Sequence, residues 1–574
     1  MKFSVVVIAR NEEKTLPRLI NSLRTFQELG GEIIVVDTNS TDHTARIARE
    51  LGCKVEEVGD RFRVFLSDEQ IAEINERFIV EGETDILRSE DSLFDFAAAR
   101  NFAASLASNS IVAMPDADEI YTQLDLKKIN DAIERGVEQL EYNFVFAHDQ
   151  FGNETIKFLH SKFYDRRKLR WIGIVHEVLS GDACREFFGE DVIKLEHYQN
   201  HETNRTGYLK GLAYDCFKNP DNDRNSHYFG RELLYVGRFH SSIKELKRHI
   251  DMNKWPAERS QSMIYVGDAL KEMGSDQCIE WYQHAFATES GRREPLMRLC
   301  QYYFEKNDYQ KVACYAMAAL QIPMSNFYAN NQEDYTDKPH AFLYWALWYL
   351  GRKDEAREHF NKALEYKPNH SKYLREYPLF YNLPKVTVLL PTLGRPEGLQ
   401  KCLDSIKVLN YPQELIEVQC EEDEPRMGVP KRVKKLYEQA SGDMFVFASN
   451  DTEFTPDCLI IAVLESHTHG LVALNTGRIL PDEGNICEHF LIRRDIVEKI
   501  GEIFDTDFYH VGVDNLLWAK CKKLGEAYRS TGAIMIHNHF SKSATRSMDS
   551  VAQLGWSHAD SDRELLKKKL AELE

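Results

Sequence analysis

The sequence predicts an α/β protein in which two segments of alternating strands and helices are separated by an all-helical segment. At the start of the chain, short apolar, β-branched runs alternate with helical patterns, which is typical of βαβ units in a parallel sheet. Strand signals then disappear from about residue 222 to residue 370. A new apolar run, Lys385–Leu390, restarts the alternation. We therefore expect three domains, at residues 1–220, 221–382 and 383–574.

The first segment alternates regularly between strand and helix signals. The predicted strands are Phe3–Ala9, Glu32–Val36, Lys54–Val58 and Ile111–Met114. The predicted helices are Glu12–Leu29, Thr41–Leu51 and Phe96–Leu106. Residues 60–93 are polar and acidic and interrupt the alternation, so we interpret them as an insertion into this domain.

The middle segment consists of amphipathic helices with turn residues at nearly regular spacing. Those turn residues are Gly237, Gly274, Asn307 and Gly351. Their spacing is close to the roughly 34-residue period of helix-turn-helix repeats. The last unit, LGRKDEAREHFNKALEYKPN, resembles a tetratricopeptide repeat (TPR), and the earlier units are more divergent. An ordinary helical bundle is the alternative to a repeat domain.

The composition excludes several classes of protein. With 43% hydrophobic and 28% charged residues, the chain is neither disordered nor fibrous. Its 72 Lys+Arg and 91 Asp+Glu give a net charge of −19, which argues against a general nucleic-acid coat. The sequence contains no run of about 18 apolar residues, so no transmembrane helix is predicted. The 11 cysteines form no CxxC pair, so we expect reduced thiols, no zinc site and a cytoplasmic location.

Five short motifs follow one another in the first segment. They are SVVVIARNEE (4–13), VVDTNSTDHT (35–44), DFAAARN (95–101), PDADE (115–119) and WIGIVHE (171–177). Each is weak alone, but together they resemble the family 2 glycosyltransferases over roughly the first 200 residues. This resemblance implies a GT-A fold, which is Rossmann-like, and the transfer of a sugar from a nucleotide-sugar donor.

A nucleotide site is expected at the ends of the first two strands. Ligands of open α/β sheets bind at the carboxyl ends of the strands, where Ala9 and Asp37 are predicted to lie. Asp37 is an acceptor suited to the N3–H of a uracil ring or to a ribose hydroxyl, and a turn or N-cap role is the alternative. By the resemblance, Ala9, Glu12, Asp37 and Arg100 line the nucleotide, and the donor is expected to be UDP-linked.

The acidic pattern Asp116-Ala117-Asp118 follows a predicted strand. An extended D-x-D puts both carboxylates on one face of the chain, and Mg²⁺ or Mn²⁺ held by carboxylates stabilises the charge of a diphosphate. By the family pattern, Asp116 contacts the donor and Asp118 holds the metal, with His176 or His197 completing the shell and His197 the better match. Glu177 is the expected general base of an inverting transfer. Ordinary surface charge is the alternative for the acidic pattern.

The last segment resembles a second GT-A domain. Its stretches VTVLLPTLGRPEGLQKCLDSI, IEVQCEED and KRVKKLYEQASGDMFVFASNDTE can be laid on the first domain in the same order. In this alignment Asp451 falls on Asp118, and Ser449 replaces Asp116. The expected site residues are Pro391, Asp423 (or Glu422) and Lys431 for the donor, Asp514 as base, and Asp451, His537 and His539 for a metal. The lost aspartate leaves open whether this domain is catalytic or only binds.

The predicted function is that of a metal-dependent glycosyltransferase with two active sites. The main alternative is one active N-terminal site, with the helical and C-terminal segments used for acceptor recognition; a non-catalytic scaffold and a nucleotidyltransferase are further alternatives. The acceptor is open among a glycan, a protein and a modified DNA base. The charge of −19 weighs against DNA, despite the basic clusters Arg166–Arg170 and Lys431–Lys435.

Overall fold

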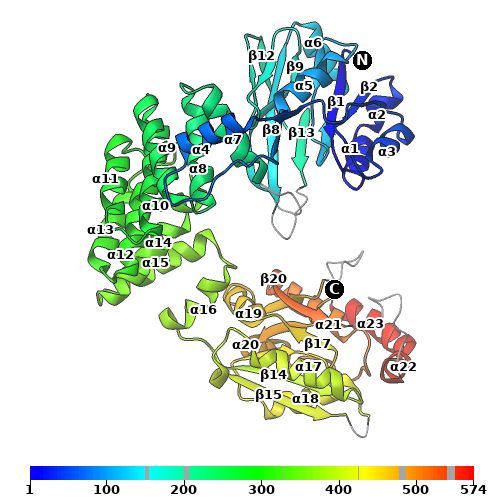
Figure 1. Ribbon diagram of the computed structural model, residues 1–574. Helices are drawn as coiled ribbons and strands as arrows, with labels where there is room; N and C mark the ends of the chain where they lie inside the picture. Colours follow the sequence, from blue (N-terminus) through cyan, green and yellow to red (C-terminus); the bar gives the residue numbers. More distant parts are fainter. Residues whose placement is uncertain are drawn as a thin grey trace. The chain divides into compact units, whose positions relative to one another are not determined.

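The computed structural model describes residues 1–148, 154–198, 206–325, 327–423, 426–477, 486–538 and 550–573. The chain divides into two compact units, residues 1–335 and 336–574. Each unit combines an α/β sheet with part of a run of helices (Figure 1). The predicted order of an α/β segment, a helical segment and a second α/β segment is confirmed. None of the described helices is long and apolar enough to span a membrane.

The sheet of the first unit has the strand order β3-β2-β1-β6-β9-β8-β13-β7, with β12 paired to β8. Its strands are β1 (Phe3–Ala9), β2 (Glu32–Asp37), β3 (Lys54–Glu57), β6 (Ile111–Ala113), β7 (Glu119–Leu124), β8 (Gln139–His148), β9 (Glu154–Asp165), β12 (Arg185–Phe188) and β13 (Ile193–His197). Its helices are α1 (Leu16–Ser22), α2 (Arg24–Glu28), α3 (Thr44–Glu50), α5 (Phe96–Ser105) and α6 (Leu126–Glu134). A short two-stranded sheet, β10 (Arg170–Ile172) and β11 (Val178–Ser180), lies outside it.

Strand β1 is buried on both faces, which explains its continuous apolar run. Val5 and Val7 belong to one core cluster with Leu16 and Leu19 of α1. Val6 belongs to a second cluster with alanines of α5. Since helices cover both faces of this parallel part of the sheet, side chains of either orientation must be apolar. The carboxyl ends of β1 and β2 carry the loops that were predicted to bind nucleotide.

The sheet of the second unit has the order β15-β14-β16-β19-β18-β20-β17. Its strands are β14 (Val386–Thr392), β15 (Ile416–Glu422), β16 (Met444–Phe447), β17 (Thr452–Phe454), β18 (Leu471–Asn475), β19 (Phe490–Arg493) and β20 (Ala527–His537). Its helices are α17 (Pro396–Lys407), α18 (Val429–Gln439), α19 (Cys458–Ser466), α20 (Arg494–Ile500), α21 (Val513–Lys523), α22 (Ser550–Trp556) and α23 (Ala559–Leu573).

The seven strands of the second sheet match seven of the nine strands of the first sheet in order and direction. Strands β2, β1, β6, β9, β8, β13 and β7 correspond in turn to β15, β14, β16, β19, β18, β20 and β17. Every neighbouring pair has the same orientation in both, parallel or antiparallel. The strand registers also agree at the predicted metal residues. His197 pairs with Glu119, which follows Asp118, and His537 pairs with Thr452, which follows Asp451.

A partly buried arginine contact also occurs in both sheets. Arg166 follows β9 and donates from Nε and Nη2 to two carbonyl groups of the α5–β6 loop, each at 3.0 Å. Arg494 follows β19 and makes the same two contacts, at 3.0 Å, with the α18–β16 loop. Arg166 therefore holds a loop in place rather than forming part of a basic surface cluster.

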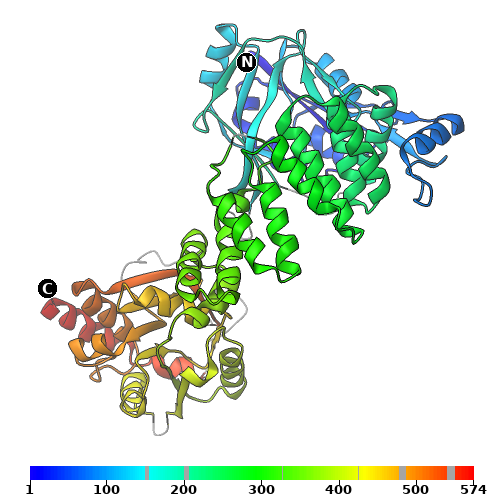
Figure 2. The same cartoon turned by 90° about the vertical axis from the view of Figure 1, so that its left-hand side faces the viewer.

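The helices that lie between the two sheets in the sequence form hairpins. They are α7 (Thr206–Lys218), α8 (Asp223–Tyr235), α9 (Phe239–Met252), α10 (Pro256–Glu272), α11 (Cys278–Thr288), α12 (Glu294–Glu305) and α13 (Tyr309–Leu320) in the first unit. The second unit begins with α14 (Asp337–Tyr349), α15 (Lys353–Tyr366) and α16 (Ser371–Phe380). All four predicted turn residues separate the two helices of a hairpin and have left-handed φ angles between 59° and 78°. Figure 2 shows the helices of the first unit (green) packed as a stack.

The predicted insertion at residues 60–93 packs on the first helices of this stack. It contains β4 (Arg63–Phe65), α4 (Asp68–Phe78) and β5 (Ser92–Phe94), and its two strands form a separate small sheet. Ile74 and Phe78 lie in one apolar cluster with Leu212 of α7 and Phe229 of α8. The insertion thus joins the α/β part of this unit to its helices (Figure 1).

Candidate active sites

Asp37 lies at the carboxyl end of β2, directly beside Ala9 at the end of β1. It is only 3% exposed. One carboxylate oxygen accepts the backbone N–H of Ser40 at 2.9 Å, which is the turn role left open by the sequence. The other oxygen, Oδ2, is buried without a hydrogen-bond partner in the described part of the chain. A buried acceptor without a described partner at the carboxyl end of the strands suits a hydrogen-bond donor of a ligand.

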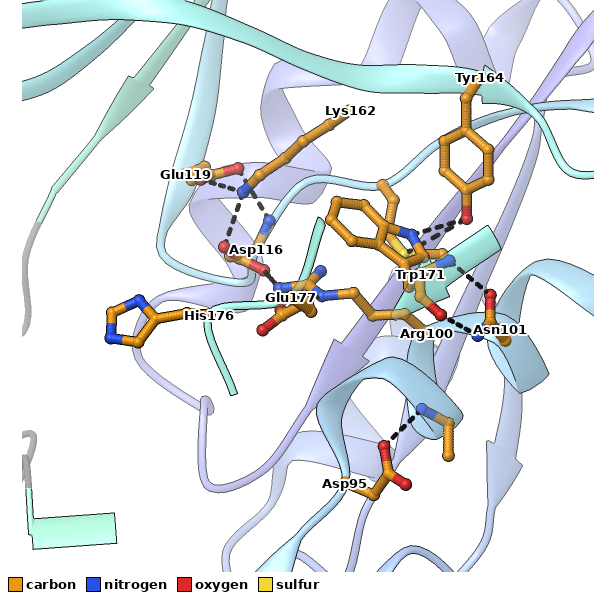
Figure 3. Close-up of polar contacts among 12 residues, drawn as sticks. Asp95, Arg100, Asn101, Asp116, Glu119, Lys162, Tyr164, Trp171, His176 and Glu177 are labelled. Carbon is orange, nitrogen blue, oxygen red and sulfur yellow. Dashed lines mark hydrogen bonds and ion pairs between the residues drawn. The ribbon is translucent and has the colours of Figure 1, made fainter. Parts of the chain in front are cut away.

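Arg100 of α5 connects two of the predicted site residues (Figure 3). Its Nε donates to Glu177 Oε1 at 2.6 Å, and its Nη2 donates to Asp116 Oδ1 at 2.7 Å. Lys162 of β9 donates to the other oxygen of Asp116 at 2.7 Å and to Glu119 at 2.5 Å. Two buried cations therefore alternate with three carboxylates.

The electrostatics of this cluster keep Asp116 ionised. Burial alone would raise the pKa of Asp116, but the charges of Arg100 and Lys162 outweigh burial and hold it well below its usual range. Burial and the charge of Asp116 raise the pKa of Glu119, although Lys162 opposes them. Lys162 and Glu119 were not predicted as site residues, and a single lysine within a strand gives no signal that separates it from a surface lysine.

Asp118 lies within hydrogen-bond distance of His197, one of the two histidines considered for the metal. The strands β7 and β13 place Asp118 Oδ2 at 3.1 Å from His197 Nε2. The other ring nitrogen, Nδ1, lies 3.1 Å from the carbonyl oxygen of Phe146. A carbonyl only accepts, so Nδ1 carries a proton and Nε2 faces the carboxylate. The backbone N–H of Tyr198 also donates to the Asp118 carbonyl at 3.0 Å.

This pair fits a divalent cation such as Mn²⁺. A carboxylate oxygen and an imidazole nitrogen held side by side are suitable ligands, and the Phe146 carbonyl orients the imidazole. No group of three or more His, Cys, Asp or Glu side chains in the described ranges is arranged to hold a metal by itself. The protein therefore offers two ligands here.

Glu12 faces the same site from the loop after β1. Burial and the nearby charges of Asp118, Asp42 and Asp116 raise its pKa, and a hydrogen bond from Thr15 opposes this rise. The structure thus brings together the loop after β1 and the acidic pattern, which are far apart in the sequence.

Glu177 lies on a segment that is fixed from two sides. On one side, the Asn101 side chain of α5 exchanges two hydrogen bonds with the backbone of Trp171 (Figure 3). On the other side, Asp215 of α7 accepts the backbone N–H of Ile174 at 2.8 Å. Burial raises the pKa of Asp215 to about 6.

His176, the other histidine considered for the metal, lies elsewhere. Its ring stacks on Tyr228 of α8 with 4.8 Å between centroids. Its carbonyl accepts a hydrogen bond from Arg224 Nη1 at 2.8 Å. The backbone at His176 has a φ of 50°, so these contacts hold an unusual conformation next to Glu177. Of the two histidines, His197 is the one paired with Asp118.

The second unit has a cavity of about 370 Å³ at the matching edge of its sheet. Five predicted residues line it: Pro391, Asp423, Asp451, Asp514 and His537. Lys431 does not line it, because it is exposed on α18 and the adjacent Arg432 faces inward. His539 lies outside the described residues. Arg432 is 2% exposed and ion-pairs with Asp423 and Glu421 at 3.3 and 2.9 Å.

Asp451 has more partners than Asp118. Ser449 Oγ donates to its Oδ1 at 2.5 Å, and Arg395 Nη1 donates to its Oδ2 at 3.0 Å. His537 Nε2 lies 3.6 Å from Oδ1. Burial would raise the pKa of Asp451, but these groups, led by His537, hold it well below its usual range. Since a cation and a hydroxyl already occupy both oxygens, this site does not fit a divalent metal as the Asp118 site does.

The family model matches the start of the chain. Residues 4–69 match the family model of Glycosyl transferase family 2. The 4,4'-diaponeurosporenoate glycosyltransferase of Staphylococcus haemolyticus is 56% identical over 52 residues, which are 9% of this chain and 14% of that protein. A glycosyltransferase of Rickettsia typhi is 46% identical over 54 residues, 9% of this chain and 18% of its own. The chain thus spans less than a fifth of the length of either relative.

Among solved structures, two similarities each cover about a third of the chain or less. The mannosyltransferase PcManGT of Pyrobaculum calidifontis is 18% identical and covers 33% of this chain and 74% of its own, with a TM-score of 0.24. A structure of the MamA protein is 18% identical and covers 29% of this chain and 85% of its own, also with a TM-score of 0.24. Scores of this size do not establish a shared fold. The family match, in contrast, places a Glycosyl transferase family 2 domain at the N-terminus of this chain.

Proposed function

We propose that this chain is a glycosyltransferase that moves a sugar from a nucleotide-sugar donor to an acceptor hydroxyl. One observation carries the proposal: Asp37, within the family 2 match at residues 4–69, holds a buried carboxylate oxygen at the carboxyl end of β2 that has no hydrogen-bond partner among the described residues. That oxygen accepts a donor hydrogen from the base or ribose of a nucleotide, which we propose is uridine.

Asp118 and His197 would hold a Mn²⁺ or Mg²⁺ ion in the N-terminal site. Such an ion neutralises the charge of a diphosphate. Arg100 and Lys162 keep Asp116 charged and hold its carboxylate in place through two ion pairs. Arg100 Nε also donates to the Glu177 carboxylate at 2.6 Å. The proposed base Glu177 and the donor-binding Asp116 are therefore held by the same arginine.

Glu177 acts as the general base in this proposal. It takes the proton of the acceptor hydroxyl, whose oxygen bonds to the anomeric carbon of the donor sugar. The bond from that carbon to the phosphate oxygen breaks, and its electron pair leaves with the nucleoside diphosphate. Attack opposite to the leaving group inverts the anomeric configuration.

The second unit is proposed to carry a second GT-A domain with its own active site. Its seven strands repeat the order of seven of the nine strands of the first sheet, and the pair Asp451–His537 has the place of Asp118–His197. Asp514, on the cavity wall, is the proposed base. The three-domain division at residues 1–220, 221–382 and 383–574 belongs to the same proposal.

A single active site is the second candidate, and Ser449 in place of Asp116 favours it. In that case, the helices and the C-terminal sheet bind the acceptor, because stacked helical hairpins form extended binding surfaces. A glycan, a protein or a modified nucleobase would each be a suitable acceptor class.

The test measures nucleoside diphosphate release by the full-length chain with Mn²⁺ and a panel of nucleotide sugars. Asp118→Ala should lower release at the N-terminal site more than about a hundredfold, since even residues behind a metal ligand contribute 10–100-fold. Asp451→Ala should remove the remaining release if two sites work. The control is Asp354→Ala, because that side chain is 94% exposed on α15.

Three outcomes separate the alternatives. Loss with Asp118→Ala alone indicates one active site. Release of pyrophosphate instead of a nucleoside diphosphate indicates a nucleotidyltransferase. No release and no nucleotide-sugar binding with Mn²⁺ contradicts the proposal and indicates a scaffold.

A further inference from the structure

The two sheets differ in charge at one equivalent position beside the site. Glu12 is the third residue after β1, and Arg395 is the third residue after β14. These strands correspond in the two sheets. The first site therefore has an acid where the second has a guanidinium.

Arg395 lies directly on the aspartate that was expected to hold a metal. Its Nη1 is 3.0 Å from Asp451 Oδ2, and both side chains line the cavity. Ser449 occupies the other oxygen at 2.5 Å. A divalent ion at Asp451 would have to displace both contacts and would meet the positive charge of Arg395. At Asp118, the corresponding acid Glu12 adds negative charge, which favours a metal ion.

The second sheet also lacks a carboxylate that the first sheet has beside its metal-side aspartate. In the first sheet, Asp116 is paired with the buried Lys162, whose carbonyl accepts the backbone N–H of Met114. In the second sheet, Phe447 pairs with Phe490 at that register position, and Ser449 replaces the aspartate. The carboxylate and its buried cation have thus been exchanged together for neutral residues. The cations that remain on the cavity wall are Arg395 and Arg432, among the described residues.

We infer that the C-terminal cavity binds the diphosphate of a nucleotide or nucleotide-sugar without a divalent ion, and that Arg395 supplies the neutralising charge. This inference rests on the proposed second glycosyltransferase site. A guanidinium donates two parallel hydrogen bonds to phosphate oxygens and stays charged at any physiological pH. The cavity volume of about 370 Å³ lies within the range of small-molecule sites. The protein therefore combines a metal-dependent site with a metal-free one.

The test measures binding to the full-length chain by calorimetry, with UDP, GDP, ADP and dTDP as probes. Asp37→Ala combined with Asp118→Ala silences the N-terminal site. In this background, we expect one probe to bind equally, within about threefold, in EDTA and in Mn²⁺. Adding Arg395→Gln should weaken that binding more than about tenfold, and Arg395→Lys should restore part of it, because it restores the charge. The control is Arg375→Ala on α16, which is exposed.

Counting bound Mn²⁺ by its electron paramagnetic resonance signal gives a readout independent of affinity. With the bound probe present, we expect one ion per wild-type chain and none in the silenced background. A bound ion in that background that disappears with Asp451→Ala would overturn the inference.

The outcomes also separate this inference from the proposed function. Binding that requires Mn²⁺, or that ignores Arg395→Gln, overturns the metal-free site but leaves a second nucleotide site in place. Absence of binding by every probe, with or without Mn²⁺, in a chain that still unfolds cooperatively, overturns the second active site itself. Circular dichroism and thermal unfolding of each variant establish that it is folded.

Discussion

At the residue scale, a short chain of buried charges organises the N-terminal site. Arg100 and Lys162 have side chains that are 7% and 5% exposed, and they connect Asp116, Glu119 and Glu177. Buried charges are tolerated only when each has a partner. The site therefore depends on all five members together.

Lys162→Met tests this dependence. The substitution leaves Asp116 with one cation and Glu119 with none, so we expect the unfolding free energy to fall by about 3–5 kcal/mol. Adding Glu119→Gln should recover part of the loss, because it removes one unpaired charge. Denaturant unfolding measures both. Lys157→Met, on the same strand but in exposed ion pairs, should cost less than about 1 kcal/mol. An equal loss from both lysines would contradict the interpretation.

A second polar contact recurs in both sheets, at the amino ends of the parallel strands, away from the proposed sites. Glu32 on β2 accepts from the Ser4 hydroxyl at 2.6 Å. Glu417 on β15 accepts from the Thr387 hydroxyl at 2.6 Å. Burial would raise both pKa values, but the hydrogen-bond donors around each carboxylate, led by Lys54 for Glu32 and by Thr387 for Glu417, lower them to about 2.

These pKa values predict an acid-sensitive contribution to stability. A carboxyl whose pKa is lowered on folding stabilises the protein above its unfolded pKa of 4.5, and this stabilisation is lost as pH falls from 4.5 to about 2. We expect Glu32→Gln to cost about 1 kcal/mol at pH 7, after screening by solvent, and nothing near pH 2. Urea unfolding at both pH values measures this. The exposed Glu28→Gln is the control, and equal losses at both pH values would contradict the assignment.

At the scale of elements, helices α7 and α8 support the segment that carries Glu177. Asp215 holds the backbone of Ile174, and Arg224 and Tyr228 hold His176. Ile174 and Val175 are also buried among the side chains of α7 and α8. The helical segment therefore contributes to the geometry of the proposed base, in addition to any role in binding.

Asp215→Ala should consequently lower kcat without weakening donor binding. Loss of the Ile174 contact lets the segment shift, and a displacement of about 1 Å can cost up to a hundredfold in rate. We expect at least about a tenfold fall in kcat and less than about a threefold change in the KM for the donor. Asp251→Ala, an exposed aspartate of α9, is the control. A change in KM alone would show that Asp215 acts on binding instead.

At the scale of the whole molecule, each compact unit has its own sheet and its own core. The core of the first sheet lies within residues 3–195, and that of the second lies within residues 389–521. The net charge of −19 is spread over both units, and only a few of the 91 acids belong to the sites described. Most acids therefore lie outside the proposed sites.

We expect residues 1–335, expressed alone, to fold and to keep metal-dependent nucleoside diphosphate release. This unit contains the buried charge cluster, the Asp118–His197 pair and the helices that hold Glu177. Thermal unfolding should show one cooperative transition, and release should be within about threefold of that of the full chain carrying Asp451→Ala. A folded fragment without release would show that the site requires the second unit.

The sequence alone determined the order of the α/β and helical segments, because strand and helix periodicities are local properties of the chain. It also located the helical turns, since a left-handed φ favours Gly and Asn. By resemblance, it predicted Asp37, Arg100, Asp116, Asp118, Glu177 and His197 as site residues, which stay a prediction. Helical periodicity could also have predicted that Arg432, rather than Lys431, faces inward, because neighbouring helix positions point about 100° apart.

Only the tertiary structure decided which charged side chains form ion pairs with one another. Lys162 and Glu119 join the site because β9 and β7 bring them beside Asp116. Arg395 reaches Asp451 although 56 positions separate them. Ion pairs between distant positions depend on sheet order and register, which a single sequence does not encode locally. Glu12 and Arg395 become equivalent through strand register alone, so the charge difference between the two sheets at this position is a property of the tertiary structure.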